Sequence, residues 1–386
     1  MSKKILFALT LVLALVSVAL AAEPIKIGYI AHLTGDAATW GVHEQNGAML
    51  AVEEINKAGG VLGRPLELIV YDVRGRQEDA VNAARRLVTM DKVVAIGGSN
   101  WSGINLATGP IVEQAKVPQI GSFPTNPAVT VDPVTKKVKP YSFRICFTDP
   151  YQGRVMAEYL LKKGIKKAAV LKDVGSDYSE GLVQYFIDNF TKGGGTIAGP
   201  FSYRTGDVDF RAQITNAKAS GAQALVMTSG GYKEMGLQIK QAAELNWKPV
   251  FIGGDGYSPN MYEIAGDAMD GSFWTYHMSF QDPKLDPLYA KYEKKYGVKA
   301  TEIVNVVAAY DIIYWIADAL KRAGKAEGPA LKDAIENTKN LKLLHFTLTV
   351  DKATHNPLNK PAAILQFKKD KKEAVFLEMF APQTSF

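Results

Sequence analysis

The fold is decided between residues 168 and 257, in three segments: AAVLKDVGSDYSEG at 168–181, ALVMTSGGYKEMG at 224–236 and VFIGGDGY at 250–257. Each segment begins with a short apolar run and continues into a loop rich in glycine, with a tyrosine in or after it. Short apolar runs that alternate with helical patterns are typical of parallel strands in an α/β sheet. Because ligands bind outside the carboxyl ends of such strands, we expect the three loops to meet at one cleft.

The same alternation fills the rest of the chain and predicts an α/β protein with parallel, doubly wound sheets. Strands are expected at 25–30, 65–72, 93–96, 117–123 and 142–147, an extended run at 271–278 and a β-hairpin at 361–380. Helices are expected at 79–90, 152–163, 180–192, 210–219, 233–245 and 303–323. A further helix starts near Trp40 and Gly41, and its spacing predicts one face that carries Val42, Gln45, Met49, Val52 and Ile55.

A chain of 386 residues is longer than a single hydrophobic core usually supports, so we expect two lobes. The alternation restarts after Cys146, which predicts an N-terminal lobe of residues 23–146 plus 279–348 and a C-terminal lobe of residues 147–278 plus 349–386. Such a division requires several connections between the lobes. Connections that move together form a multi-strand hinge, and a hinge between two lobes allows a cleft to close.

The N-terminus predicts export. Lys3 and Lys4 precede an apolar run, and Ala19-Leu20-Ala21 provides a cleavage site, so residues 1–22 have the order of a signal peptide. No other stretch is expected to span a bilayer. The only cysteine, Cys146, lies in a predicted strand and is expected to be a buried thiol, and no cysteine stands at the cleavage site to carry a lipid. We therefore expect a free protein in the periplasm.

Several classes of function lack their sequence signals. The net charge of +6 includes two lysine clusters, at 136–139 and 368–372, that are typical of solvated tips rather than of a nucleic-acid site. The five histidines form no zinc motif, and the chain has no nucleophile elbow, no Walker loop and no dinucleotide fingerprint. We expect no nucleic-acid partner, no cofactor, no metal and no catalysis.

Five stretches carry a family resemblance: Gly35 with Trp40-Gly41, AVEEIN at 51–56, GGVLGRPL at 59–66, TNP at 125–127 and DYSEG at 177–181. They resemble bacterial leucine/isoleucine/valine-binding proteins, which are periplasmic receptors of ABC importers. The resemblance covers nearly all of the chain after residue 22. It implies the type I periplasmic binding fold, a monomer, capture of a branched-chain or other hydrophobic or aromatic amino acid by cleft closure, and delivery to an inner-membrane permease.

The resemblance also implies a set of ligand-binding residues. Ser102 would take the ligand carboxylate, the backbone carbonyl of Phe123 would accept from the ammonium, and Thr125 would hold the head group. Asp255 would pair with the ammonium. Aromatic walls would come from Tyr178, Tyr232 and Trp40. Asn305 stands where an apolar pocket residue is common, which departs from the leucine, isoleucine and valine pattern.

The residue types suit a buried zwitterion, because each of its charges needs a compensating partner. Hydroxyl groups such as those of Ser102 and Thr125 suit a carboxylate, and the Asp255 carboxylate suits an ammonium. Each residue also has a purely structural interpretation, as a helix cap, a turn residue or a packed ring. Two functional alternatives stay open: the same fold with an aromatic or other small organic acid, and a periplasmic ligand sensor.

Overall fold

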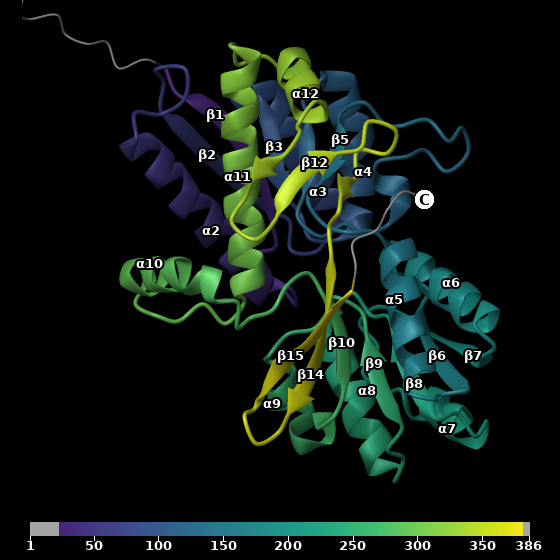
Figure 1. Ribbon diagram of the computed structural model, residues 1–386. Helices are drawn as coiled ribbons and strands as arrows, with labels where there is room; N and C mark the ends of the chain where they lie inside the picture. Colours follow the sequence, from purple (N-terminus) through teal and green to yellow (C-terminus); the bar gives the residue numbers. More distant parts are fainter. Residues whose placement is uncertain (1–22, 381–386) are drawn as a thin grey trace, which may run out of the picture.

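The computed structural model describes residues 23–380, which form two α/β lobes that lie end to end (Figure 1). The predicted signal peptide, residues 1–22, lies outside the described residues, and so do residues 381–386. The two lobes are built on separate sheets, and helices cover both faces of each sheet (Figure 1).

The first lobe contains a five-stranded parallel sheet with the order β2-β1-β3-β4-β5. Its strands are β1 (Ile25–Ala31), β2 (Leu66–Asp72), β3 (Ala95–Gly98), β4 (Gln119–Gly121) and β5 (Ser142–Arg144). The accompanying helices are α2 (Ala38–Lys57), α3 (Gln77–Arg86), α4 (Ser102–Ala115), α10 (Asp286–Tyr296), α11 (Ile303–Ala323) and α12 (Gly328–Glu336). The predicted helix at 79–90 ends earlier, because its last turn continues as a short π-helix, Leu87–Asp91.

The second lobe contains a seven-stranded sheet with the order β15-β14-β10-β9-β8-β6-β7. Its parallel strands are β6 (Lys167–Asp173), β7 (Thr196–Tyr203), β8 (Ala224–Met227), β9 (Val250–Gly253) and β10 (Phe273–Tyr276). The predicted hairpin forms the antiparallel edge strands β14 (Ala362–Lys368) and β15 (Glu373–Phe380). The helices are α5 (Asp149–Lys162), α6 (Asp177–Lys192), α7 (Arg211–Ala219), α8 (Tyr232–Glu244) and α9 (Met261–Ala265).

The doubly wound α/β prediction is therefore confirmed, although the sequence analysis missed β7. This strand lies at the edge of the sheet and exposes much of its length, so its sequence has no continuous apolar run. Gly199 and Pro200 interrupt it further, and both residues are uncommon within strands.

The predicted buried face of α2 is correct at Val52 and Ile55 but wrong at Val42. Val42 is 40% exposed, whereas the buried residues include Glu44, Gly47 and Ala48. This face packs against α11 so closely that a Cβ atom on Gly47 would lie 2.2 Å from the carbonyl oxygen of Val306. Small residues thus make the contact with α11, and a search for large apolar side chains misses this part of the buried surface.

Helix α11 corrects a second expectation, namely that no segment after the N-terminus is apolar enough to cross a membrane. Its 21 residues reach a mean hydropathy of 1.5, which meets that test by length and composition. However, 83% of its most apolar window is buried within the protein. Helix α11 is packed against α2 and β3, and its apolar surface belongs to the core of the first lobe.

Within residues 23–380 the chain passes between the lobes at three places: after β5, after β10 and before β14. Rings of two of these segments stack, since Phe147 and His277 have ring centroids 4.0 Å apart. The predicted lobe boundaries themselves stay a prediction. Residue 348 lies inside β12 (Thr347–Val350), which pairs with β13 (Pro357–Leu358), so this small sheet continues past the predicted third boundary.

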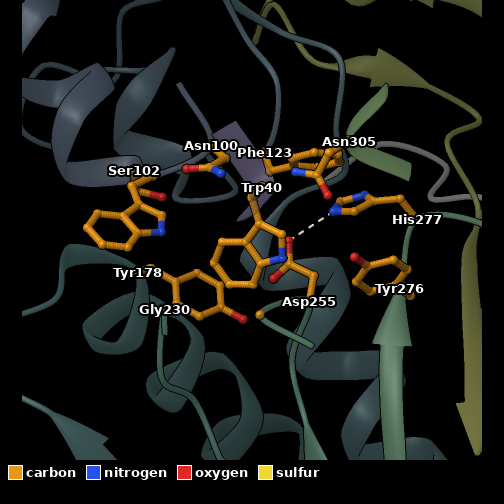
Figure 2. A pocket seen from close by; sticks show the side chains of 12 residues that line it. Trp40, Asn100, Ser102, Phe123, Tyr178, Gly230, Asp255, Tyr276, His277 and Asn305 are labelled. Carbon is orange, nitrogen blue, oxygen red and sulfur yellow. Dashed lines mark hydrogen bonds and ion pairs between the residues drawn. The ribbon is translucent and has the colours of Figure 1, made fainter. Parts of the chain in front are cut away.

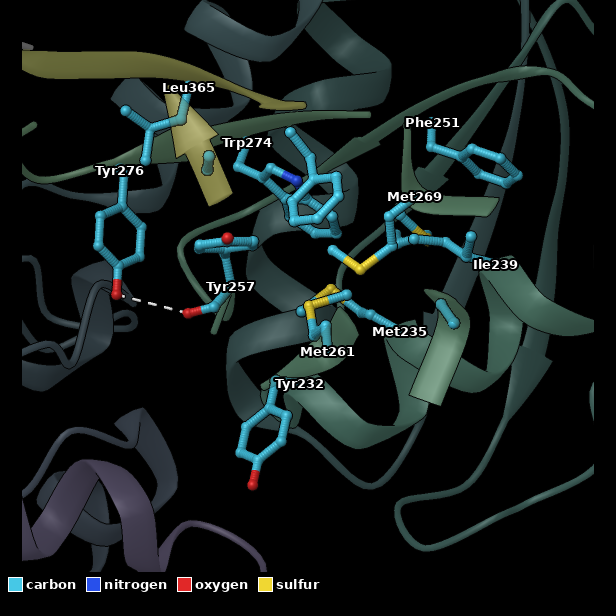
Figure 3. Packing of buried hydrophobic residues seen from close by; sticks show 14 of the residues in the cluster. Tyr232, Met235, Ile239, Phe251, Tyr257, Met261, Met269, Trp274, Tyr276 and Leu365 are labelled. Carbon is cyan, nitrogen blue, oxygen red and sulfur yellow. Dashed lines mark hydrogen bonds between the residues drawn. The ribbon is translucent and has the colours of Figure 1, made fainter. Parts of the chain in front are cut away.

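A dense aromatic and methionine core packs one face of the second sheet against α8 and α9 (Figure 3). The rings of Tyr257 and Trp274 lie 5.1 Å apart, and the Tyr276 hydroxyl donates to the Tyr257 carbonyl at 3.4 Å. These contacts fix the loop after β9, which carries Asp255, against the end of β10.

Candidate functional site

A cavity between the lobes collects residues from both sheets (Figure 2). Its lining consists of Trp40, Asn100, Trp101, Ser102, Phe123, Tyr178, Gly230, Asp255, Gly256, Tyr276, His277 and Asn305. All except Asn305, which lies in the first turn of α11, come from the carboxyl end of a parallel strand or from the segment after it. The expected meeting of the strand-end loops is therefore observed. A water-sized molecule can occupy about 40 Å³ of this cavity, so Trp40 and its neighbours leave little free space.

The first-lobe wall depends on the turn that follows β3. Gly98 and Ser99 both have positive φ angles, 95° and 61°, and the Ser99 amide donates to the Ile30 carbonyl at 2.8 Å. The Asn105 side chain holds the turn from the other side by donating to the Ser99 carbonyl at 3.1 Å. This turn presents Asn100 and Ser102 to the cavity.

Ser102 is the first residue of α4. Amide groups in the first turn of a helix have no acceptor within the helix, so this end of α4 favours an anionic group. The Ser102 hydroxyl also accepts from the Asn126 amide at 3.2 Å, which ties α4 to the loop after β4. The predicted carboxylate-binding residue therefore lies at the wall of the cavity, beside a helix terminus.

Asp255 lies on the opposite wall, and its side chain is 6% exposed. One of its oxygens accepts from Gln152 Nε2 at 3.0 Å, and the other lies 2.9 Å from His277 Nε2 (Figure 2). Burial lowers the pKa of His277, while the Asp255 carboxylate opposes that shift. The neutral imidazole can donate to Asp255 through Nε2, which leaves Nδ1 as an acceptor. Asp255 is therefore oriented by protein groups before any ligand arrives.

Tyr178 joins the same network. Its hydroxyl donates to Gln152 Oε1 at 3.3 Å, and burial, with Asp255 as a smaller cause, raises its pKa well above the usual value. Gly254 makes room for this ring, because a Cβ atom there would lie 2.0 Å from the Tyr178 hydroxyl oxygen. The two residues before Asp255 must therefore be glycine, because neighbouring aromatic side chains approach the backbone too closely to leave room for a Cβ atom.

Aromatic rings make up much of the remaining lining. Trp40 projects into the centre of the site, and its ring meets that of Tyr232 edge to face at 5.3 Å (Figure 2). Phe123 lies 4.6 Å from the His277 ring. Trp101, which the sequence analysis did not select, lines the cavity and contacts His32 at 4.6 Å between ring centroids.

Two predicted site residues lie behind the cavity wall. Tyr232 is buried and supports Trp40, but it is not among the lining residues. Thr125 is fully buried, and its carbonyl accepts from the Asp149 amide at 2.9 Å. Burial raises the pKa of Asp149 well above its usual value, and the Thr125 hydroxyl opposes the shift. The structure therefore places Thr125 against the start of α5 rather than at the cavity surface.

The sequence analysis did not select the buried residue Glu44, which lies behind Asn305. Its carboxylate accepts from Ser122 Oγ at 3.0 Å, from Asn305 Nδ2 at 3.3 Å and from the Tyr29 hydroxyl at 3.3 Å. Burial raises its pKa to about 7, and these hydrogen bonds oppose the shift. A glutamate among small residues of a helix gives no sequence signal for this role.

A second, larger cavity of about 390 Å³ adjoins the first and shares Trp101, Ser102, Tyr178 and Gly230 with it. Polar contacts cross between the lobes along its rim. The Lys233 ammonium lies 2.7 Å from the Asp36 carboxylate, and Asn126 Nδ2 donates to the Asp177 carbonyl at 2.7 Å. The two cavities together form a cleft whose inner end is closed by Trp40, Asp255 and His277.

The inner cavity contains several buried polar atoms that have no partner among residues 23–380: both amide atoms of Asn100, His277 Nδ1, Trp40 Nε1 and Trp101 Nε1. Buried polar groups in native proteins are nearly always hydrogen-bonded, so these atoms indicate a site where a polar ligand supplies the hydrogen bonds. In the same part of the chain, no cluster of three or more histidine, cysteine or acidic side chains is arranged to hold a metal ion.

Comparison with known proteins agrees with this architecture. A family model described as periplasmic binding protein matches residues 24–372. The chain belongs to this periplasmic binding protein family. Among its curated relatives is a leucine-, isoleucine-, valine-, threonine- and alanine-binding protein of Pseudomonas aeruginosa, 30% identical over 86% of this chain and 87% of the relative.

Solved structures extend the comparison. A leucine-binding protein of Thermotoga maritima has a TM-score of 0.83 and 31% identity, and the match covers 92% of this chain and 98% of the other. A solute-binding protein of an ABC transporter from Rhodopseudomonas palustris, solved with 3,4-dihydroxybenzoic acid, has a TM-score of 0.79 and 26% identity, with 93% and 97% coverage. Periplasmic binding proteins with this fold thus take both amino acids and aromatic acids.

Proposed function

We propose that the chain is the substrate-binding protein of an ABC importer, which captures an amino acid between its lobes in the periplasm and delivers it to an inner-membrane permease. The proposal rests on one observation. Ser102, at the start of α4, and Asp255, on the opposite lobe, line the same small cavity. A group that favours an anion and a group that favours a cation thus line one small space between the lobes, which is the arrangement that a zwitterion requires when the lobes open to admit it.

In this proposal the ligand carboxylate binds at Ser102, where a hydroxyl and the helix terminus supply donors. The ammonium binds at Asp255 and at the nearby carbonyl of Phe123. Gln152 and His277 occupy two acceptor positions of Asp255, and a carboxylate offers about four, so the ammonium still finds an acceptor. Trp40 and Tyr178 cover the ligand and exclude water.

Delivery requires the lobes to open and close. The three segments that connect them provide the hinge, and the Asp36–Lys233 pair lies across the rim. We propose a monomer, because each cleft is formed by one chain. The permease would recognise the closed pair of lobes, because ligand binding shifts the protein toward the closed form.

Isothermal titration of the mature protein with each proteinogenic amino acid tests the proposal. Binding proteins of this kind work at roughly micromolar affinity, which corresponds to about −8 kcal/mol. We expect at least one amino acid to bind in that range, and Asp255→Ala to weaken it strongly. Absence of binding across the whole panel would reject the amino-acid assignment.

A second candidate ligand is a hydroxylated aromatic acid. It is favoured by the hydrogen bonds that Gln152 and His277 already make to Asp255, which satisfy this carboxylate without an ammonium, and by the rings of Trp40, Trp101 and Phe123. The relative solved with 3,4-dihydroxybenzoic acid shows that the fold accommodates such a ligand. A thermal-shift comparison of leucine, phenylalanine, benzoate and 3,4-dihydroxybenzoate separates the two candidates, because each predicts stabilisation by its own group of compounds alone.

A further inference from the structure

We propose that the preferred ligand is an amino acid with an uncharged hydrogen-bonding side chain, a carboxamide or a hydroxyl, and that Asn100 and Asn305 select it. This inference rests on the proposed function and specifies the ligand of the same cavity. It differs from the assignment to branched-chain amino acids, whose side chains offer no hydrogen bonds.

The first observation is the state of Asn100. The residue is 8% exposed and lines the cavity, and neither Nδ2 nor Oδ1 has a partner within residues 23–380. The preceding residue, Ser99, is held by hydrogen bonds to Ile30 and Asn105, which fixes the backbone that carries Asn100 beside the cavity. A buried amide left without hydrogen bonds is costly, so a ligand group that both donates and accepts gains most at this position.

The second observation is Asn305, which enters the cavity from α11 (Figure 2). Its Nδ2 donates to Glu44 at 3.3 Å, and Glu44 is itself fixed by Ser122. With Nδ2 engaged behind the wall, the Asn305 carbonyl oxygen is the atom left for the ligand. The cavity therefore offers a donor and an acceptor at Asn100 and a further acceptor at Asn305.

Carboxamides and hydroxyls are the side-chain groups that both donate and accept without charge. A carboxamide can exchange two hydrogen bonds with Asn100, whereas a hydroxyl can donate one and accept one. A charged side chain would lack a compensating partner, because Asp255 and His277 are the only acidic or basic side chains that line the cavity within the described chain. Asp255 is assigned to the ligand ammonium, and burial favours the neutral form of His277. An aliphatic side chain would leave Asn100 buried and unpaired.

Isosteric pairs of amino acids provide the test. Asparagine and leucine have nearly the same shape, and so have threonine and valine, so each pair differs mainly in hydrogen bonding. A site built around a polar side chain rejects the apolar analogue by a large factor. We expect isothermal titration to show asparagine or threonine binding at least about tenfold more tightly than its partner, and the stronger pair distinguishes a carboxamide from a hydroxyl ligand.

Substitution of the selecting residue should reverse this order. Asn100→Leu keeps the side-chain shape and removes both polar atoms, so we expect leucine or valine to match or overtake the polar partner. Asn305→Leu provides an independent variant if Asn100→Leu unfolds, which thermal unfolding detects. Asn216→Leu is the matched control, because Asn216 is exposed on α7 and should leave the preference unchanged.

The outcomes separate the two proposals. If the wild type binds leucine or valine as tightly as asparagine and threonine, or if Asn100→Leu and Asn305→Leu both keep the polar preference, the side-chain inference is wrong while the amino-acid function stands. If no amino acid binds at all, the proposed function itself fails.

Discussion

Two buried polar clusters of this protein contrast sharply: the cleft around Asn100, and a hinge cluster that consists of Asp311, His345 and Lys360. The hinge cluster is internally complete. Asp311 accepts from the Leu344 amide at 2.9 Å and lies 2.7 Å from His345 Nδ1, while Lys360 contacts the other His345 nitrogen. Lys360 also lies 4.4 Å from the Phe346 ring centroid.

The cleft is equally buried but incomplete, because Asn100, Trp40 Nε1 and His277 Nδ1 lack partners within residues 23–380. The comparison separates two uses of buried polarity. A group whose hydrogen bonds are satisfied inside the protein fixes the relation between elements, here α11 and the segment before β14. A group left unsatisfied at a cavity is completed by what enters it.

The largest expected effect follows from breaking the complete cluster. Asp311→Ala removes the acceptor of two donors and leaves Lys360 without its buried counter-charge, so we expect the free energy of unfolding to fall by about 3–5 kcal/mol. Urea titration of the ligand-free protein measures this loss. In contrast, Asn100→Leu removes atoms that are already unpaired and should not lower the free energy of unfolding. A larger loss for Asn100→Leu than for Asp311→Ala would invert the comparison.

The second effect concerns binding. Asp255→Asn keeps the shape of the side chain but removes the charge that we assign to the ligand ammonium. Hydrogen bonds to charged groups contribute about 1.5–3 kcal/mol, so affinity for the best amino acid should fall by roughly 10- to 100-fold. Asp188→Asn on the exposed face of α6 is the control for titration. An affinity equal to that of the wild type would show that the Asp255 charge does not contribute to ligand binding.

Glu302 is intermediate between the two clusters, because only one of its carboxylate oxygens is hydrogen-bonded. Its burial predicts that the stability of the protein depends on pH. Ser258 donates to its Oε1, Oε2 has no partner within the described residues, and burial raises its pKa from 4.5 to about 8. The folded protein therefore keeps a proton that the unfolded chain loses, and this contribution to stability disappears as the pH rises from about 4.5 to about 8.

Glu302→Gln should remove that dependence, because its amide does not titrate. We expect the variant to gain stability relative to the wild type as the pH increases across this interval, measured by denaturant titration at several pH values. Lys360 and Asp311 are present in both proteins, so their contributions to the pH dependence of stability cancel when the free energy of unfolding of the wild type is subtracted from that of the variant. A difference that does not change with pH would show that Glu302 titrates normally.

The smallest effect concerns the rim of the cleft. Lys233 and Asp36 are 2.7 Å apart, but their side chains are 49% and 76% exposed. Exposed pairs contribute at most about 1 kcal/mol, so Lys233→Gln should weaken ligand binding by less than about fivefold, and only at low salt. Titration at two ionic strengths checks this. A large, salt-independent loss would mean that Lys233 contacts the ligand directly.

The sequence was sufficient for the layout of the site but not for its details. Apolar runs predicted most strands, and the rule that ligands bind beyond strand ends located the cleft and the loop that carries Asp255. The resemblance to a known family, not the strand pattern, selected Ser102. Edge strand β7 was missed because much of it is exposed, so its sequence lacks the continuous apolar run that identifies a buried strand. The burial of Glu44 depends on the close packing of α2 on α11, and the small residues that allow this packing give no clear signal in the sequence.

Side-chain direction was the other limit. Thr125 and Tyr232 lie in the segments after predicted strands, yet neither lines the cavity: Thr125 contacts Asp149, and Tyr232 packs against Trp40. Asn100 follows the predicted strand at 93–96, but its importance depends on the left-handed turn at Gly98 and Ser99, which a residue pattern does not fix.

The most direct test of this account is a crystal structure with the tightest-binding amino acid of the panel. We predict that the ligand lies between the lobes, with its carboxylate at Ser102, its ammonium at Asp255 and a polar side-chain atom within hydrogen-bond distance of Asn100. A ligand outside the cleft, or one that places hydrocarbon against the Asn100 amide, would contradict the account.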